Sequence, residues 1–175
     1  MKLVSIVLSL LVISATLSAA ASADEKSQAD IHAVVASFQR AIVAKDADGF
    51  MTLFYGEVIP WIGVYDESSL QRKRKKNADQ AKARALGAEG PRSFINGIVK
   101  SAHRLEEKFW DVSIDSDDMV ASVSFNYSFH ANDYKRNWGR EMWQLVHTDT
   151  GWKITSVIFS LQLNPEPPPW TTPAN

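Results

Sequence analysis

Apolar residues recur at helical spacing in the first part of the chain. One stripe of apolar side chains, three or four positions apart, predicts an amphipathic helix over residues 28–45. A break at Asp46 to Asp48 offers an N-cap for a short second helix, and Gly90-Pro91 begins a third, because proline is tolerated at the first helical position. The three stripes are Ile31, Val34, Val35, Phe38, Ala41 and Ile42; Phe50, Leu53 and Phe54; and Phe94, Ile95, Ile98, Val99 and Ala102.

The pattern changes to that of strands in the second half of the chain. Residues 105–114, 119–130, 138–147 and 152–163 are rich in β-branched and aromatic residues and are separated by short, turn-rich segments. They predict an antiparallel meander. Residues 58–65 also read as a strand, and Pro60 favours an edge position or a bulge for it. Helices followed by a twisted antiparallel sheet predict an α+β fold, in which the sheet wraps the long helix and leaves a cone-shaped cavity.

The last two predicted strands form a hairpin with a distinctive arrangement of tryptophans. Gly139 to Leu163 contains Trp143-x-Leu145 before the turn, Gly151-Trp152-Lys153-Ile154 after it, and Ser160 eight residues beyond the second tryptophan. With the order and length of the elements over residues 28–163, this hairpin resembles the nuclear transport factor 2-like superfamily, including its SnoaL-like and ketosteroid isomerase-like branches. The resemblance implies the cone-shaped fold. It leaves the activity open, since that superfamily contains isomerases, dehydratases, cyclases, epoxide hydrolases and non-catalytic binding or dimerisation modules.

The first residues have the three parts of a secretory signal peptide. Met1-Lys2 is a positive n-region, Leu3 to Leu17 a mostly apolar h-region, and Ala21-Ser22-Ala23 a small-residue cleavage site. The apolar stretch falls short of the roughly 20 residues of a membrane span, so we predict cleavage rather than a membrane anchor, and a periplasmic or secreted protein. The chain has no cysteine, which excludes disulfides and a lipid-modified cysteine. The predicted organisation is a signal peptide (1–23), one domain (24–164) and an extended proline-rich tail (165–175).

Charge gives little indication of a polyanionic partner, because the formal net charge of the chain is −1. Residues 71–84 nevertheless carry seven Lys and Arg residues against the single Asp79, a composition compatible with docking on anionic lipid or nucleic acid. The segment lacks the aromatic residues that stack on bases, and an exported protein seldom meets nucleic acid. We interpret the segment as a solvated helix or loop and expect no nucleic-acid partner.

The predicted hairpin register brings one acid onto an apolar face. If residues 148–151 form the turn, Glu141 and Trp143 share a face, and the alternation of the preceding strand turns that face inward. A matching register places Tyr127 beside Glu141 and Phe125 beside Trp143. On the last strand the same parity turns Ile154, Ser156, Ile158 and Ser160 inward. We therefore predict a pocket lined by Trp61, Phe125, Trp143 and Ser156, with Glu141 and Tyr127 as the candidate catalytic pair.

A carboxyl group on an apolar wall has a raised pKa unless a cation or a hydrogen-bond donor compensates. Glu141, with Tyr127, can then abstract and return a proton beside a carbonyl, or simply hold a polar group of a ligand. In the alternative interpretation Arg104 or Arg140 neutralises Glu141, or Glu141 lies at the rim in solvent. The resemblance weakens the catalytic interpretation, because the superfamily's enzymes commonly place an Asp or His on the last strand or the first helices. The inward residues of the last strand here include no strong base.

The sequence contains no recognisable metal or cofactor motif. Its four histidines, His32, His103, His130 and His147, have no ligand-like spacing, and no Gly-rich phosphate loop or nucleophile elbow is present. We expect neither a metal nor a cofactor. On the outer face the predicted parity exposes Met142, Val157, Phe159 and Leu161, a patch that indicates a homodimer interface or a surface covered by the tail through Trp170.

Three functions fit this pattern. The first is a pocket protein that binds a small, largely apolar ligand, and the aromatic wall together with the incomplete catalytic set favours it. The second is an isomerase, dehydratase or cyclase that uses Glu141 and Tyr127 for proton transfer. The third is a dimeric accessory subunit without a ligand.

Overall fold

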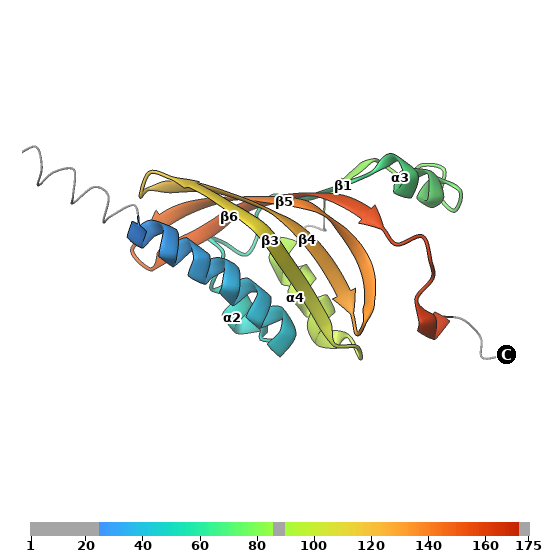
Figure 1. Ribbon diagram of the computed structural model, residues 1–175, viewed down its shortest axis with the longest axis horizontal. Coiled ribbons are helices and arrows are strands. Elements are labelled where there is room, and N and C mark those ends of the chain that lie inside the picture. Colours follow the sequence, from blue (N-terminus) through green and yellow to red (C-terminus); the bar gives the residue numbers. More distant parts are fainter. Residues whose placement is uncertain (1–24, 86–89, 172–175) are drawn as a thin grey trace, which may run out of the picture.

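A curved six-stranded sheet covers a layer of helices (Figure 1). The computed structural model describes residues 25–85 and 90–171. Residues 25–44 are helical, and the elements that follow are α2 (Ala47–Met51), β1 (Trp61–Tyr65), α3 (Glu67–Arg74), β2 (Ala83–Ala85), α4 (Gly90–Lys100), β3 (Leu105–Ser116), β4 (Val120–Ala131), β5 (Tyr134–Thr148), β6 (Gly151–Leu163) and the 3₁₀ turn η1 (Pro169–Thr171). The predicted signal peptide lies outside the described residues.

The sheet has the strand order β2-β1-β6-β5-β4-β3. Strands β3 to β6 form the predicted antiparallel meander. Strand β1 joins β6 in parallel and is itself paired with β2, so the sheet is mixed and β1 is not the edge strand that Pro60 indicated. Pro60 precedes β1, where its missing N–H costs no ladder bond, and its carbonyl accepts from the Val157 N–H at 2.9 Å. The α+β cone fold is confirmed.

The helices form where the apolar stripes predict them. Asp46 caps α2 by accepting a hydrogen bond from the Gly49 N–H at 2.9 Å. Figure 1 shows the N-terminal helix, α2 and α4 on one side of the sheet. Phe38 lies fully buried at the centre of this layer, with its ring centroid 4.8 Å from those of both Phe50 and Trp143. The predicted core stripe of the long helix therefore packs against the concave face of the sheet.

Irregular pairing decides which side chains of β5 and β6 face the interior. Between β5 and β6, Leu145 pairs with Ile154 but Gln144 pairs with Ser156, so Thr155 is an extra residue of β6. A bulge of this kind reverses the alternation of every residue beyond it. Between β4 and β5, His130 pairs with Lys135 and Phe129 pairs with Asn137, so Arg136 is an extra residue of β5.

The basic segment and the tail adopt defined structure next to the sheet. The segment begins in α3, which Asp66 caps by accepting from the Ser69 N–H at 3.1 Å, and ends in β2. In the described part of the tail, Trp170 stacks on His103 with ring centroids 4.2 Å apart, so the tail does not cover the outer face as one interpretation had it. Among the residues that the structure describes, no helix is long and apolar enough to cross a membrane.

Candidate functional site

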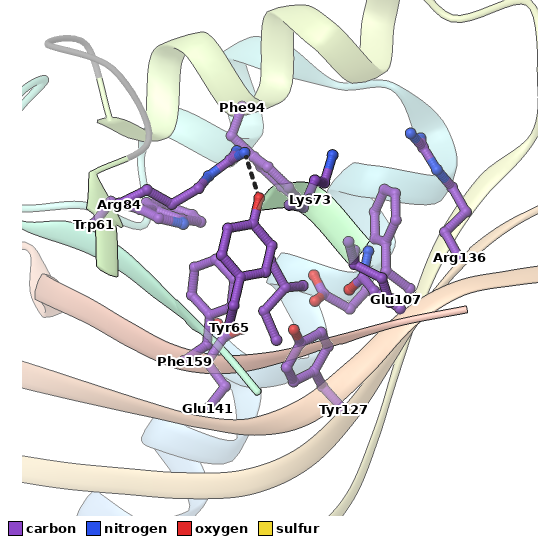
Figure 2. Close-up of a pocket in the computed structure, with 14 residues that line it drawn as sticks. Trp61, Tyr65, Lys73, Arg84, Phe94, Glu107, Tyr127, Arg136, Glu141 and Phe159 are labelled. Carbon is purple, nitrogen blue, oxygen red and sulfur yellow. Dashed lines mark hydrogen bonds between the residues drawn. The ribbon is translucent and has the colours of Figure 1, made fainter. Parts of the chain in front are cut away.

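A cavity of about 290 Å³ lies between the concave face of the sheet, β1, β2 and α3. Its size is near the lower limit of small-molecule sites in proteins. Half of the lining residues are aromatic or aliphatic, and the other half carry polar or charged groups (Figure 2). The lining residues are Trp61, Tyr65, Phe94, Phe129, Phe159, Leu161 and Leu163, with the polar Lys73, Arg84, Glu107, Tyr127, Arg136, Asn137 and Glu141.

Glu141 is buried in this wall, with 3% of its surface exposed. It projects inward from β5, directly opposite Phe125 on β4. The indole Nε1–H of Trp143, two residues further along the same face, donates to the Glu141 carboxyl at 2.6 Å. Burial raises the pKa of Glu141 to about 8, and the bond from Trp143 opposes that rise. The acid therefore holds its proton at neutral pH.

Glu107 is a second buried acid in the same cavity, 5% exposed. It projects from β3 opposite Phe129. Burial and the neighbouring charge of Glu141 raise the pKa of Glu107 well above its usual range. No ion pair to Glu107 or Glu141 occurs among residues 25–85 and 90–171. Two carboxyl groups in one apolar cavity titrate as a pair, and ionising both is unfavourable.

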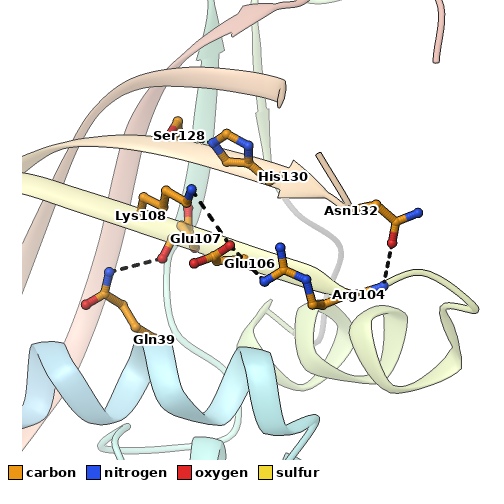
Figure 3. A network of polar contacts seen from close by, with 8 residues as sticks. All are labelled: Gln39, Arg104, Glu106, Glu107, Lys108, Ser128, His130 and Asn132. Carbon is orange, nitrogen blue, oxygen red and sulfur yellow. Dashed lines mark hydrogen bonds and ion pairs between the residues drawn. The ribbon is translucent and has the colours of Figure 1, made fainter. Parts of the chain in front are cut away.

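Glu107 was not among the predicted site residues, although the signal was present. Leu105, Glu107 and Phe109 alternate with Glu106 and Lys108 in the first half of β3. The apolar members of the first set place Glu107 on the inward face. The backbone carbonyl of Glu107 also accepts from Gln39 Nε2 at 3.0 Å, which links β3 to the N-terminal helix at the site (Figure 3).

Tyr127 lines the cavity, but its hydroxyl is already engaged. The Tyr127 O–H donates to the backbone carbonyl of Ser160 at 2.9 Å. Burial, followed by the charges of Glu141 and Glu107, raises the pKa of Tyr127. Tyr127 pairs with Gly139 on β5, not with Glu141 as predicted. The side chains of Tyr127 and Glu141 still share the inward face, but the register of β4 against β5 differs from the predicted one by two residues.

The predicted aromatic wall is divided between the cavity and the core. Trp61 lines the cavity. Phe125 and Trp143 are fully buried behind it, with ring centroids 4.9 Å apart, so they support Glu141 from the core and do not line the cavity. The prediction that Ser156 lines the cavity is wrong, because the bulge at Thr155 pairs it with the exposed Gln144.

Neither of the arginines proposed to neutralise Glu141 reaches it. Arg104 pairs with Glu106 at 3.1 Å on the outer side of β3 (Figure 3). Arg140 donates through Nη2 to Ser124 Oγ at 2.9 Å, also on the outer face. The placement of Glu141 at a solvent-exposed rim is equally wrong, because the residue is buried. Figure 3 also shows His130 on the outer face, where its Nε2 lies 2.9 Å from Ser128 Oγ.

Three cationic side chains line the cavity, and none of them was predicted to do so. Two belong to the segment that we interpreted as a solvated helix or loop, and the third lies outside the predicted strands. Lys73 comes from α3 and Arg84 from β2, both within the basic segment 71–84, and Arg136 is the extra residue of the β5 bulge. Their positions at the cavity depend on how α3, β2 and the β5 bulge pack together, which no local sequence pattern predicts. The basic segment thus contributes directly to the candidate site.

The predicted apolar patch on the outer face is wrong for the residues of β6, because the bulge at Thr155 reverses their alternation. Val157, Phe159 and Leu161 lie on the inner face, and Phe159 and Leu161 line the cavity. Met142 and Ile158, which are opposite each other, are an exposed apolar pair on the outer face, 41% and 46% exposed.

Among the described residues, no group of three or more His, Asp or Glu side chains is arranged to hold a metal ion. In comparisons with known proteins, no family model and no curated protein matches the sequence. Many solved structures match the fold.

Three of the solved structures that match the fold have the following similarity to this chain. A candidate scytalone dehydratase from Novosphingobium aromaticivorans has a TM-score of 0.60 at 12% identity, over 82% of this chain and 89% of that one. An NTF2-like protein with a cystatin-like fold from the same organism has a TM-score of 0.58 at 12% identity, over 85% and 87%. A protein of unknown function from Mycobacterium tuberculosis has a TM-score of 0.56 at 15% identity, over 79% and 75%. The resemblance predicted from the closing hairpin is confirmed at the level of the fold: the chain has the cystatin-like fold of the nuclear transport factor 2-like proteins.

Proposed function

We propose that this protein is an exported pocket protein that binds a small, largely apolar molecule in the cone of the sheet. The observation that carries the proposal is the pair of buried acids, Glu107 and Glu141, in a cavity otherwise lined mainly by aromatic and aliphatic side chains. Burying carboxyl groups that no cation pairs with costs free energy. A fold that keeps two such groups in one cavity supports a use for them with a ligand.

The acids fit a ligand that carries a neutral polar group. A protonated carboxyl group both donates and accepts a hydrogen bond, so Glu141 or Glu107 can bind a hydroxyl or a carbonyl oxygen at the bottom of the cavity. The rings of Trp61, Phe94 and Phe159 offer the apolar surface for the rest of the molecule. Export rests on the tripartite N-terminus alone.

A second candidate is an isomerase, dehydratase or cyclase that works by proton transfer. The observation in its favour is the raised pKa of Glu141, about 8, which suits a group that takes and returns a proton near neutral pH. The ionised form of Glu141, which a pKa of about 8 leaves as a minor fraction at neutral pH, would remove a proton beside a ligand carbonyl and return it to another atom of the same ligand. Tyr127 would contribute orientation, because its proton is held by the Ser160 carbonyl. We place ligand binding first, since that bond engages the Tyr127 proton and leaves Glu141 to transfer protons alone.

Native mass spectrometry of the protein purified from its own host tests the binding proposal. The expected result is a retained small molecule whose occupancy falls in Glu141→Gln. The matched control is Met142→Gln, which places the same side chain one residue further on, on the outer face. Equal occupancy in both variants, or no bound molecule at any stage of purification, would contradict the proposal. Incubation of the retained ligand in D₂O separates the second candidate, because proton transfer by Glu141 would add deuterium to the ligand with wild type but not with Glu141→Gln.

A further inference from the structure

Three cations line the side of the cavity that lies away from Glu141. Figure 2 shows the nitrogen ends of Arg84, Lys73 and Arg136 together along that side, while Tyr127 and Glu141 lie toward the sheet. The Arg84 Nη1 donates to the Tyr65 hydroxyl at 3.1 Å, and the Arg136 guanidinium lies 5.8 Å from the centre of the Phe129 ring. We call Lys73, Arg84 and Arg136 the cationic rim.

Each member of the rim is held by a different part of the fold. Lys73 lies on α3, which is fixed to β6 by the bond from Arg72 Nη2 to the Leu163 carbonyl at 2.8 Å. Arg84 lies on β2 and pairs with Gly63 of β1. Arg136 is placed by the bulge of β5. Three independent elements thus bring positive charge to one opening.

No carboxylate compensates this charge among residues 25–85 and 90–171. The ion pairs there involve other residues: Lys26–Asp30, Lys82–Glu67, Arg92–Glu57, Arg104–Glu106 and Lys108–Glu106. The acids of the same cavity do not compensate the rim at neutral pH, because burial favours their protonated forms. Like charges grouped at a partly enclosed opening focus a positive potential into it, and such a potential attracts anions.

The positive surface continues outside the cavity. A neighbouring groove of about 790 Å³ shares Lys73, Arg136, Asn137 and Leu163 with the cavity. It adds Arg72, Lys75 and Lys76 from the basic segment. An anion approaching the cavity therefore meets positive charge before it reaches the rim.

We propose that the ligand is an amphipathic anion, with its apolar body among the aromatic rings and a carboxylate or sulfonate group bound by Lys73, Arg84 and Arg136. This inference rests on the proposed binding function and specifies its ligand class. Arginine and lysine form charge-assisted hydrogen bonds with such oxyanions. The protonated Glu141, on the side of the cavity toward the sheet, binds a neutral polar group and makes that side unsuitable for a second anionic group.

A pair of fluorescent probes that differ only in the anion tests the proposal. 1-Anilinonaphthalene-8-sulfonate carries a sulfonate, and N-phenyl-1-naphthylamine is the same aromatic body without it. We expect the sulfonate probe to bind wild type at least about tenfold more tightly. Lys73→Gln, Arg84→Gln and Arg136→Gln should each weaken the sulfonate probe by about five- to tenfold and change the neutral probe by less than about twofold. Added salt should weaken only the sulfonate probe.

Two control variants identify the site that the probes occupy. Lys82→Gln removes a charge from the same basic segment but outside both the cavity and the groove, and it should change neither affinity. Met142→Gln alters the outer face and should also change neither; a loss there would place the probes outside the cavity and overturn the proposal.

The outcomes separate this inference from the binding function. If the neutral probe binds wild type as tightly as the sulfonate, or if the rim variants weaken both probes equally, the anion proposal is wrong and the apolar cavity stands. If neither probe binds wild type, both the anion proposal and the proposed cavity function are wrong for ligands of this size.

Discussion

The indole N–H of Trp143 donates to the Glu141 carboxyl at 2.6 Å, between two residues that share the inward face of β5. The bond favours the ionised form of Glu141 in a position where burial favours the protonated form. Burial dominates, because the pKa of Glu141 is raised to about 8. The site therefore contains an acid on which two opposing effects act, and burial is the larger of the two.

Removal of the indole donor should shift that balance. In Trp143→Phe, Glu141 loses its hydrogen bond, so we expect its pKa to rise above that of wild type. The measurement is a titration of the ¹³C-labelled glutamate carboxyl groups by NMR. Trp138→Phe is the matched control, since it makes the same substitution on the same strand and removes a donor only to Gln162. An unchanged pKa in Trp143→Phe would show that the bond has no electrostatic effect on Glu141.

The buried acids should make the protein less stable as the pH rises. A carboxyl group whose pKa is higher in the folded state than in the unfolded state binds more protons when folded, so the free energy of unfolding falls between the unfolded value, 4.5, and the folded value, about 8. A shift of this size corresponds to about 4–5 kcal/mol when complete. We expect a higher melting temperature near pH 5 than near pH 8 in thermal unfolding scans.

Glu141→Gln should reduce this pH dependence and stabilise the protein at pH 8, because the amide keeps an acceptor for Trp143 and carries no charge to bury. Glu107→Gln should have the same direction of effect. Met142→Gln, with its side chain on the outer face, should leave the slope unchanged. A Glu141→Gln variant that melts lower than wild type at pH 8 would contradict the burial of an uncompensated acid.

Gly139 allows β6 to approach β5 where Tyr127 meets the Ser160 carbonyl. A Cβ atom at Gly139 would lie 2.1 Å from that carbonyl oxygen, so Gly139→Ala should cost about 2 kcal/mol or more and disturb the bond to Tyr127. The control is Gly97→Ala in α4, where a Cβ meets nothing within 4 Å and alanine should stabilise the helix by about 0.5–1 kcal/mol. Urea denaturation of both variants measures the difference. Equal stability would mean that β6 can shift at Ser160 without penalty.

The homodimer remains a proposal, and the corrected outer face changes the residue that tests it. Ile158 and Met142 form an exposed apolar pair on this face, so Ile158→Glu should yield monomers in light scattering if the sheets pack face to face. Gln144→Glu places the same charge on a polar part of that face and should leave the mass unchanged. A wild-type protein that is monomeric at high concentration would remove the proposal.

Local patterns in the chain were enough to predict the main helices and strands, the fold class and the inward faces of β4 and β5. The apolar stripes at 31–42 and 94–98 predicted the helices, and the alternation of Phe125, Tyr127 and Phe129 predicted the inward face of β4. Such patterns are local consequences of helix and strand geometry, so they can be read from a sequence. Matching the inward face of β4 to β5 predicted that Glu141 faces inward. The alternation of Leu105, Glu107 and Phe109 in β3 would have predicted the same for Glu107.

The pairing of strands and the composition of the site became visible only in three dimensions. One extra residue, Thr155, turned Ser156 away from the cavity and brought Phe159 into it, and Thr155-Ser156 carries no local signal for a bulge. The cationic rim required α3, β2 and the β5 bulge to meet, although Arg136 is far along the chain from Lys73 and Arg84. Strand registers, and the contacts between elements that are distant in the sequence, depend on how the faces of the sheet and helices pack against each other. The periodicity of one segment contains no information about this packing.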